Sequence, residues 1–134
     1  MMTDNLKTAI ILKSHSTGNH DHLGNVTAQI EYSKISERWS FPTEYYTFTE
    51  TGGDGSTVQF VMIDTVILGG GSEVLHPVTD EIVRELHGNE LPGPSDQAKA
   101  DAQLAWIAST IASSTADYLL VAGHYPVYVT LMID

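Results

Sequence analysis

Residues 18–25 read GNHDHLGN, and residues 122–127 read AGHYPV. The second run follows an apolar stretch, 118–122, that favours a strand. Asn19 offers an amide oxygen and His124 an imidazole nitrogen, and both atom types are metal ligands. A lone Asn–His pair in turns is also explained by simple hydrogen bonding. The two runs are far apart in the sequence, so a shared site needs a fold that brings them together.

The pattern between these runs alternates strands and helices. We expect strands at 9–12, 44–49, 58–66 and 118–122, a turn at 52–55, and helices at 25–36 and from an N-cap at Ser95 to about Ser114. The later helix should bury an apolar face of Ala100, Leu104, Ile107 and Ile111. Residues 69–95 read as a long loop with at most a helical turn near 80–86. This order predicts an α/β fold with site residues just past strand ends.

Composition narrows the class of protein. With 134 residues the chain forms one domain at most. Its formal charge of −11, with only six Lys and Arg, argues against nucleic acid or an anionic membrane as a partner. Cysteine is absent, which excludes disulfides and thiolate metal sites. We find no transmembrane run, and no signal peptide is visible.

Longer stretches of the sequence carry a family resemblance. GNHDHLGN, FVMIDTVIL at 60–68 and QLAWIASTIASSTADYLLVAGHYPVY at 103–128 resemble the tartrate-resistant (purple) acid phosphatases of the metallophosphatase, or calcineurin-like phosphoesterase, superfamily. The resemblance implies a partial αββα sandwich, its middle portion only, at residues 18–128. We expect divergent segments at 1–17 and 129–134.

The resemblance also implies roles for individual residues. Asn19 and His124 would be ligands of the divalent metal, and His20 would be catalytic, facing the phosphate or the leaving group. Asp21 would orient a neighbouring histidine from the second shell. His22 would also lie in that shell, although a solvent-exposed histidine fits its position equally well.

The complete enzymes of this family hold a di-iron centre, ferric plus divalent, and hydrolyse phosphate monoesters and phosphoproteins. The family's GDxx, GDN and GHxH motifs do not flank the matching region, so we expect this chain not to retain the iron pair. The function implied is acid phosphatase, inactive in this truncated form. The alternative is a non-catalytic truncated isoform or gene-model fragment that acts at most as an interaction fragment.

Several residues have simpler interpretations. Asn25-Val26-Thr27 is an N-glycosylation sequon, and the resembling enzymes are lysosomal or secreted, although such triplets also arise by chance. We expect Asp64 to cap the turn after its strand and to lie outside the metal shell. We expect His15, His76 and His87 to lie on the surface.

Overall fold

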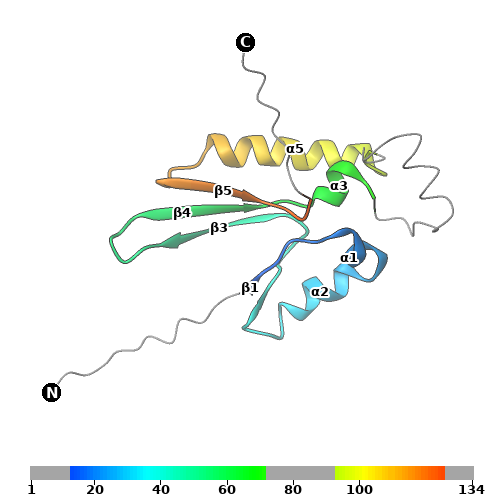
Figure 1. The fold of residues 1–134 in the computed structure, drawn as a ribbon, viewed down its shortest axis with the longest axis horizontal. Helices are drawn as coiled ribbons and strands as arrows, with labels where there is room; N and C mark the ends of the chain where they lie inside the picture. Colours follow the sequence, from blue (N-terminus) through cyan, green and yellow to red (C-terminus); the bar gives the residue numbers. More distant parts are fainter. Residues whose placement is uncertain (1–12, 72–92, 126–134) are drawn as a thin grey trace, which may run out of the picture.

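The central element is a three-stranded sheet, seen in a computed structural model that describes residues 13–71 and 93–125 (Figure 1). Strands β3 (Tyr46–Thr51) and β4 (Thr57–Met62) form an antiparallel hairpin, and β5 (Tyr118–Ala122) pairs with β4 in parallel. The α/β prediction is confirmed. The bounds of β5 are those expected, and the expected hairpin is present with a turn in which Gly55 has φ 87°.

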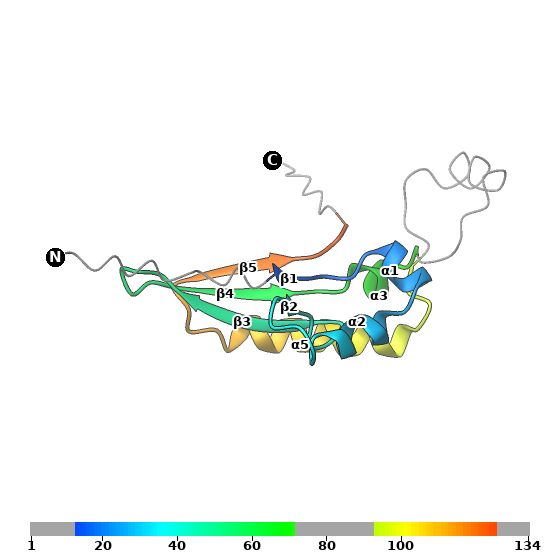
Figure 2. The same ribbon diagram turned by 90° about the horizontal axis from the view of Figure 1, so that it is seen from below.

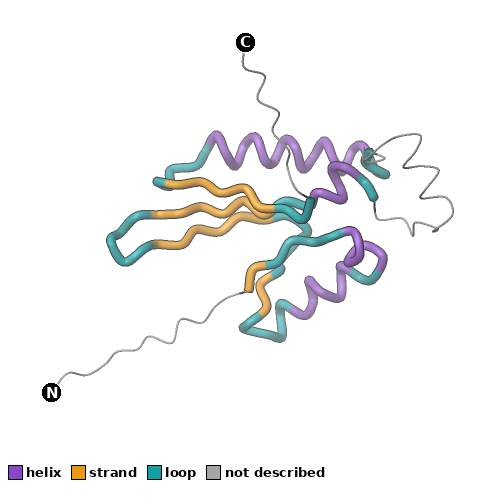
Figure 3. The backbone as a smooth tube through the Cα atoms, viewed as in Figure 1, coloured by secondary structure: helices purple, strands orange, loops and turns teal. Residues whose placement is uncertain are grey.

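The parallel pair β4–β5 is joined by helical segments, as Figure 3 shows. Helix α3 (Thr65–Gly69) follows β4 closely, and α5 (Gln97–Ala112) precedes β5. Our prediction of a strand through residue 66 is therefore wrong at its end. Asp64 accepts hydrogen bonds from the Val66 and Ile67 amides and starts a helix there. Its expected capping role is confirmed.

A smaller unit lies beside the sheet. Strands β1 (Lys13–Ser14) and β2 (Trp39–Ser40) pair in parallel, and helices α1 (Asn19–Leu23) and α2 (Val26–Tyr32) connect them. Figures 1 and 2 together show α5 on one face of the sheet and α1 on the other, near the end where β4 and β5 finish. The helix expected at 25–36 is present but shorter, and α1 was not anticipated.

The core sits between this unit and the sheet. Phe41, Tyr46 and Met62 are buried there, with apolar residues from α2, β2, β3 and β4 packed around them. The ring of His15 stacks on Trp39 with 3.5 Å between centroids, and His15 is half-buried. The expectation that His15 lies on the surface is wrong, because an aromatic neighbour covers its ring.

Helix α5 buries only part of the face expected, because Ala100 is buried and Ile107 is half-buried, while the other two residues are exposed. Its buried residues are Ala100, Gln103 and Thr110, whereas Leu104 is 52% exposed and Ile111 is 44% exposed. The Gln103 side-chain amide bonds both backbone groups of Asp64, and this contact sets the rotation of the helix. Its N-cap is Asp96, not Ser95, because the Asp96 carboxylate accepts from the Lys99 amide.

Some expectations fall outside the described residues. These are the strand at 9–12, the helical turn near 80–86, the divergent tail at 129–134, and the surface positions of His76 and His87. Among the helices that the structure describes, none has both the length and the apolar character needed to cross a membrane.

Candidate metal centre at the strand ends

Asn19 and His124 come together in the fold. Asn19 begins helix α1, and His124 follows the end of β5. The Oδ1 atom of Asn19 lies 3.1 Å from Nε2 of His124, across 105 positions of sequence, and the two atoms form a hydrogen bond. The hydrogen-bonding alternative that the sequence left open is therefore present in this structure. The carboxyl ends of parallel strands open at one edge of a sheet, which is where ligands bind in open α/β folds. The fold therefore places this pair at a position suited to a site.

Two glycines allow this approach. A Cβ atom on Gly18 would lie 2.8 Å from the His124 ring, and one on Gly123 would lie 2.6 Å from Cγ2 of Thr65. The backbone at Gly18 is extended, with φ −107° and ψ 175°, so its glycine is required by the packing of the ring and not by backbone strain. The absent side chain of Gly18 thus leaves space for the His124 ring, and that of Gly123 leaves space for the Thr65 methyl group.

The donor atoms fit two positions around a metal ion. Ligands about 2.1 Å from a first-row ion and in neighbouring positions lie roughly 3.0 to 3.4 Å apart, so the observed 3.1 Å is compatible. Within residues 13–71 and 93–125, no group of three or more His, Cys, Asp or Glu side chains is placed to hold a metal. The described residues therefore supply a pair of candidate ligands and not a closed coordination shell.

His20 lies next to this pair on α1. Its side chain is exposed, and no hydrogen bond joins it to any other described residue. Its imidazole is therefore accessible from solvent, next to the candidate ligand Asn19. The catalytic role expected for His20 stays a prediction.

Asp21 has partners other than a histidine. One carboxylate oxygen accepts from the Gly18 amide at 2.8 Å, and the other accepts from Nε2 of Gln29 at 2.9 Å. These bonds, that from Gln29 first, hold the pKa of Asp21 below its usual range. Through them Asp21 closes the first turn of α1 and ties it to α2. The structure thus shows it fixing Gly18, whereas an oriented histidine was expected.

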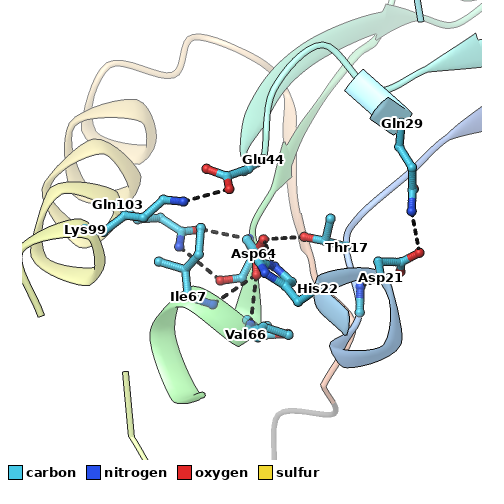
Figure 4. A network of polar contacts seen from close by, with 12 residues as sticks. Thr17, Asp21, His22, Gln29, Glu44, Asp64, Val66, Ile67, Lys99 and Gln103 are labelled. Carbon is cyan, nitrogen blue, oxygen red and sulfur yellow. Dashed lines mark hydrogen bonds and ion pairs between the residues drawn. The ribbon is translucent and has the colours of Figure 1, made fainter. Parts of the chain in front are cut away.

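His22 reaches a buried carboxylate, as Figure 4 shows. Its Nε2 atom donates to Oδ2 of Asp64 at 2.7 Å, and the Thr17 hydroxyl donates to the same oxygen. Asp64 is 0% exposed. His22 is therefore held in the interior side of α1, and the alternative of a freely exposed histidine does not apply.

Sequence reasoning missed the extent of the contacts made by Asp64. Besides capping α3, it joins α1 through His22 and α5 through Gln103 (Figure 4). A carboxylate at a strand end is a common helix cap, and its partners lie far away in sequence. Gln103 gave no distinctive signal either, because α5 carries other polar and charged residues such as Lys99 and Asp101.

Tyr125, directly after His124, is anchored to α3. Its backbone amide donates to the Thr65 hydroxyl at 3.1 Å, and its own hydroxyl donates to the Gly70 carbonyl at 2.9 Å. Burial and then the Asp64 charge raise the pKa of Tyr125. The phenol therefore stays protonated as a hydrogen-bond donor at neutral pH.

Asn25 caps helix α2. Its Oδ1 accepts from the Ala28 amide at 2.9 Å, and the residue is exposed. That bond uses the side-chain oxygen and not the amide nitrogen, to which an N-linked glycan attaches. Glycosylation at Asn25 stays a prediction.

Most of the chain is similar in sequence to known proteins. Tartrate-resistant acid phosphatase type 5 from Sus scrofa is 46% identical over 112 residues, which are 83% of this chain and 30% of that protein. The chain matches a segment of tartrate-resistant acid phosphatase. The enzymes of that name from Rattus norvegicus and Homo sapiens are 44% and 42% identical over 112 residues, or 31% of each.

This similarity confirms the resemblance to the tartrate-resistant acid phosphatases that the motifs indicated. No protein-family model matches the chain. The chain spans less than a third of the length of these tartrate-resistant acid phosphatases, at 30% to 31%.

Proposed function

We propose that this chain carries part of the metal and phosphate site of an acid phosphatase. The observation that supports this most directly is the approach of Asn19 to His124, with 3.1 Å between Oδ1 and Nε2. The relatives that share this segment are tartrate-resistant acid phosphatases. The reaction class is hydrolysis of a phosphate monoester.

Asn19 and His124 would hold the divalent metal of the pair. When bound, a two-metal centre supplies a hydroxide at mild pH and stabilises the oxygens of the attacking and leaving groups. His20 would hydrogen-bond the phosphate or protonate the leaving oxygen, a role worth roughly 10²- to 10⁴-fold in rate. Asp21 and His22 would fix α1, which carries these residues, through their bonds to Gly18 and Asp64.

Finer features follow from the same relationship. The described strands and helices would belong to a metallophosphatase αββα sandwich. The centre would be di-iron, ferric plus divalent, and its remaining ligands would come from outside the described residues. Phosphoproteins would be among the substrates. A lysosomal or secreted location would agree with a glycan on Asn25.

One observation favours a second candidate, a non-catalytic interaction fragment. Both α5 and β5 carry exposed apolar side chains, including Leu104, Tyr118 and Leu120. Solvent-exposed apolar surface of this kind often marks a protein–protein contact.

A chimera tests the proposal. Residues 18–128 would replace the matching segment of a tartrate-resistant acid phosphatase, and hydrolysis of an aryl phosphate would be measured at acidic pH together with metal content. We expect activity and two metals per chain. A folded chimera that holds no metal would refute the assignment of Asn19 and His124.

Single variants of the chimera separate the roles. Asn19→Ala and His124→Ala should lose metal and activity together, because each removes a ligand. His20→Ala should keep the metal and lower the rate by roughly 10²- to 10⁴-fold. Asn25→Gln is the control: it should leave turnover unchanged and remove a glycan. Normal turnover in His20→Ala would show that the proton donor lies elsewhere.

A further inference from the structure

Two consecutive residues, Asp64 and Thr65, contact both halves of the site. They lie between the end of β4 and the first turn of α3, and both are buried. The side chain of Asp64 reaches the segment that carries Asn19. The side chain of Thr65 reaches the segment that carries His124.

On the first side, Asp64 binds residues that flank Asn19. Its Oδ2 accepts from the hydroxyl of Thr17, before α1, and from Nε2 of His22, within α1 at 2.7 Å. Residues three apart in a helix lie on neighbouring parts of its surface, so fixing His22 also fixes the orientation of Asn19. The carboxylate thus holds α1 on both sides of the candidate ligand.

On the second side, Thr65 contacts the residues that flank His124. Its hydroxyl accepts from the backbone amide of Tyr125 at 3.1 Å. Its methyl group packs so closely on Gly123 that a Cβ atom there would lie 2.6 Å away. His124 is therefore held through the residue before it and the residue after it.

Asp64 itself is held by hydrogen bonds to both its side chain and its backbone. Oδ1 of Asp64 accepts from the Val66 and Ile67 amides at 2.9 and 3.0 Å. The Gln103 side chain donates to the Asp64 carbonyl at 3.0 Å and accepts from the Asp64 amide at 2.7 Å. Buried, fully bonded polar groups of this kind keep one arrangement, because each lost partner leaves a costly unsatisfied atom.

We propose that Asp64 and Thr65 are positioning residues that set Asn19 and His124 at ligand distance. Their role toward a metal rests on the proposed phosphatase function, but their role in bringing the two side chains together does not. Neither residue is proposed as a ligand of the metal or as a contact of the substrate, because their polar atoms bond other protein groups. Each acts through the segment that it holds.

The test uses the chain itself with NMR and zinc. One readout is the set of nuclear Overhauser effects from the His124 ring to Gly18 and to the Asn19 side-chain amide. The other is the affinity for added Zn²⁺, measured by calorimetry. The variants are Asp64→Asn, which keeps the shape but loses an acceptor, Thr65→Val, which loses the hydroxyl, and Thr65→Ser, which keeps it.

We expect Asp64→Asn and Thr65→Val to weaken the His124–Asn19 effects and to lower zinc affinity by about 10- to 100-fold. Thr65→Ser should keep the native spectrum around Tyr125. The matched controls are Asp54→Asn and Thr47→Val, which lie on the hairpin away from the site and should change neither readout. Native His124–Asn19 effects in folded Asp64→Asn and Thr65→Val would overturn the proposal.

Two further outcomes are distinguishable. If the parent chain binds no zinc, the two candidate ligands alone do not hold the ion, and the Overhauser effects decide whether Asp64 and Thr65 position Asn19 and His124. If Asp64→Asn does not fold, Thr17→Val and His22→Gln each remove one of its two bonds toward α1. A native His124–Asn19 arrangement in both of these milder variants would equally overturn the role of Asp64.

Discussion

At the scale of single residues, Gly18 controls the distance between Asn19 and His124. An added Cβ would lie 2.8 Å from the His124 ring, while the extended backbone at Gly18 tolerates alanine. His124 is exposed, so its ring can swing away at small cost. We expect Gly18→Ala to change the free energy of unfolding by about 1 kcal/mol or less and to abolish the Asn19–His124 contact. Denaturant melts and NMR spectra of the His124 ring measure both effects.

Gly53 provides a matched control for this change. Nothing lies within 4 Å of a Cβ built at Gly53, and its φ is not positive. Gly53→Ala should leave the stability and the His124 spectrum unchanged. If Gly18→Ala keeps the native His124 spectrum as well, the ring does not pack on Gly18 as described.

The site was only partly predictable at this scale. Asn19 and His124 were found because each follows a glycine in a motif that resembles the tartrate-resistant acid phosphatases. The fold then brings the two residues together. The partners of Asp64 were not found, because contacts among Thr17, His22, Asp64 and Gln103 depend on tertiary structure and leave no periodic pattern. Asp64 was interpreted correctly as a cap, but a cap uses only one of its two oxygens.

At the scale of elements, helix α5 shows why the apolar pattern misled. Ala100, Leu104, Ile107 and Ile111 share a stripe, yet the structure buries Gln103 and exposes Leu104. The spacing of apolar residues does not include the two buried hydrogen bonds between the Gln103 side chain and the Asp64 backbone. Strand β5 was placed correctly since its apolar run is short and bounded by turn residues. Strand β4 was extended too far because its apolar run continues into α3.

A pair of substitutions on α5 tests this rotation. Gln103→Leu should lower the free energy of unfolding by about 1 to 3 kcal/mol, because it leaves the Asp64 amide and carbonyl without partners. Leu104→Gln, the reverse change at the next position, should alter it by about 0.5 kcal/mol or less. Urea denaturation of both variants gives the comparison. A larger loss from Leu104→Gln would mean that the apolar stripe faces inward after all.

The start of β5 depends on a carboxylate and therefore on pH. The Thr57 amide and then its hydroxyl donate to Asp117 and hold the pKa of that carboxyl below its usual range. A folded-state pKa below the unfolded one adds stability above about pH 3.8 that is lost as the pH falls through the folded pKa. We expect exchange of the Thr57 amide, after correction for intrinsic rates, to become faster as the pH falls through the lowered pKa of Asp117 than it is at about pH 5.

Asp117→Asn should remove most of this acid dependence at Thr57. Asp101→Asn, on the exposed side of α5, serves as the control and should keep it. Hydrogen exchange of the Thr57 amide in the two variants is the measurement. Equal acid dependence in Asp117→Asn and Asp101→Asn would show that the charge of Asp117 does not link the start of β4 to the start of β5.

At the scale of the whole molecule, β5 is an edge strand of the sheet formed by the described residues. Among the described strands β5 pairs only with β4, and its residues Tyr118, Leu120 and Val121 are all exposed. Exposed apolar strands with an open edge pair readily with other chains. The net charge of −11 opposes this association over distances within a Debye length, so the two effects compete and salt decides between them.

We therefore expect the chain to associate as its concentration and the salt concentration rise, with β5 as the contact. Leu120→Lys places a charge on that strand and should shift association to higher protein concentration, as measured by sedimentation velocity. Ile35→Lys is matched: Ile35 is 80% exposed and Leu120 is 51% exposed, and each change moves the formal charge from −11 to −10. Both variants lose one exposed aliphatic side chain and gain the same cation, so only the place of the charge differs. Equal shifts in the two variants would assign the association to general charge or hydrophobicity, whereas a shift confined to Leu120→Lys would assign it to the edge of β5.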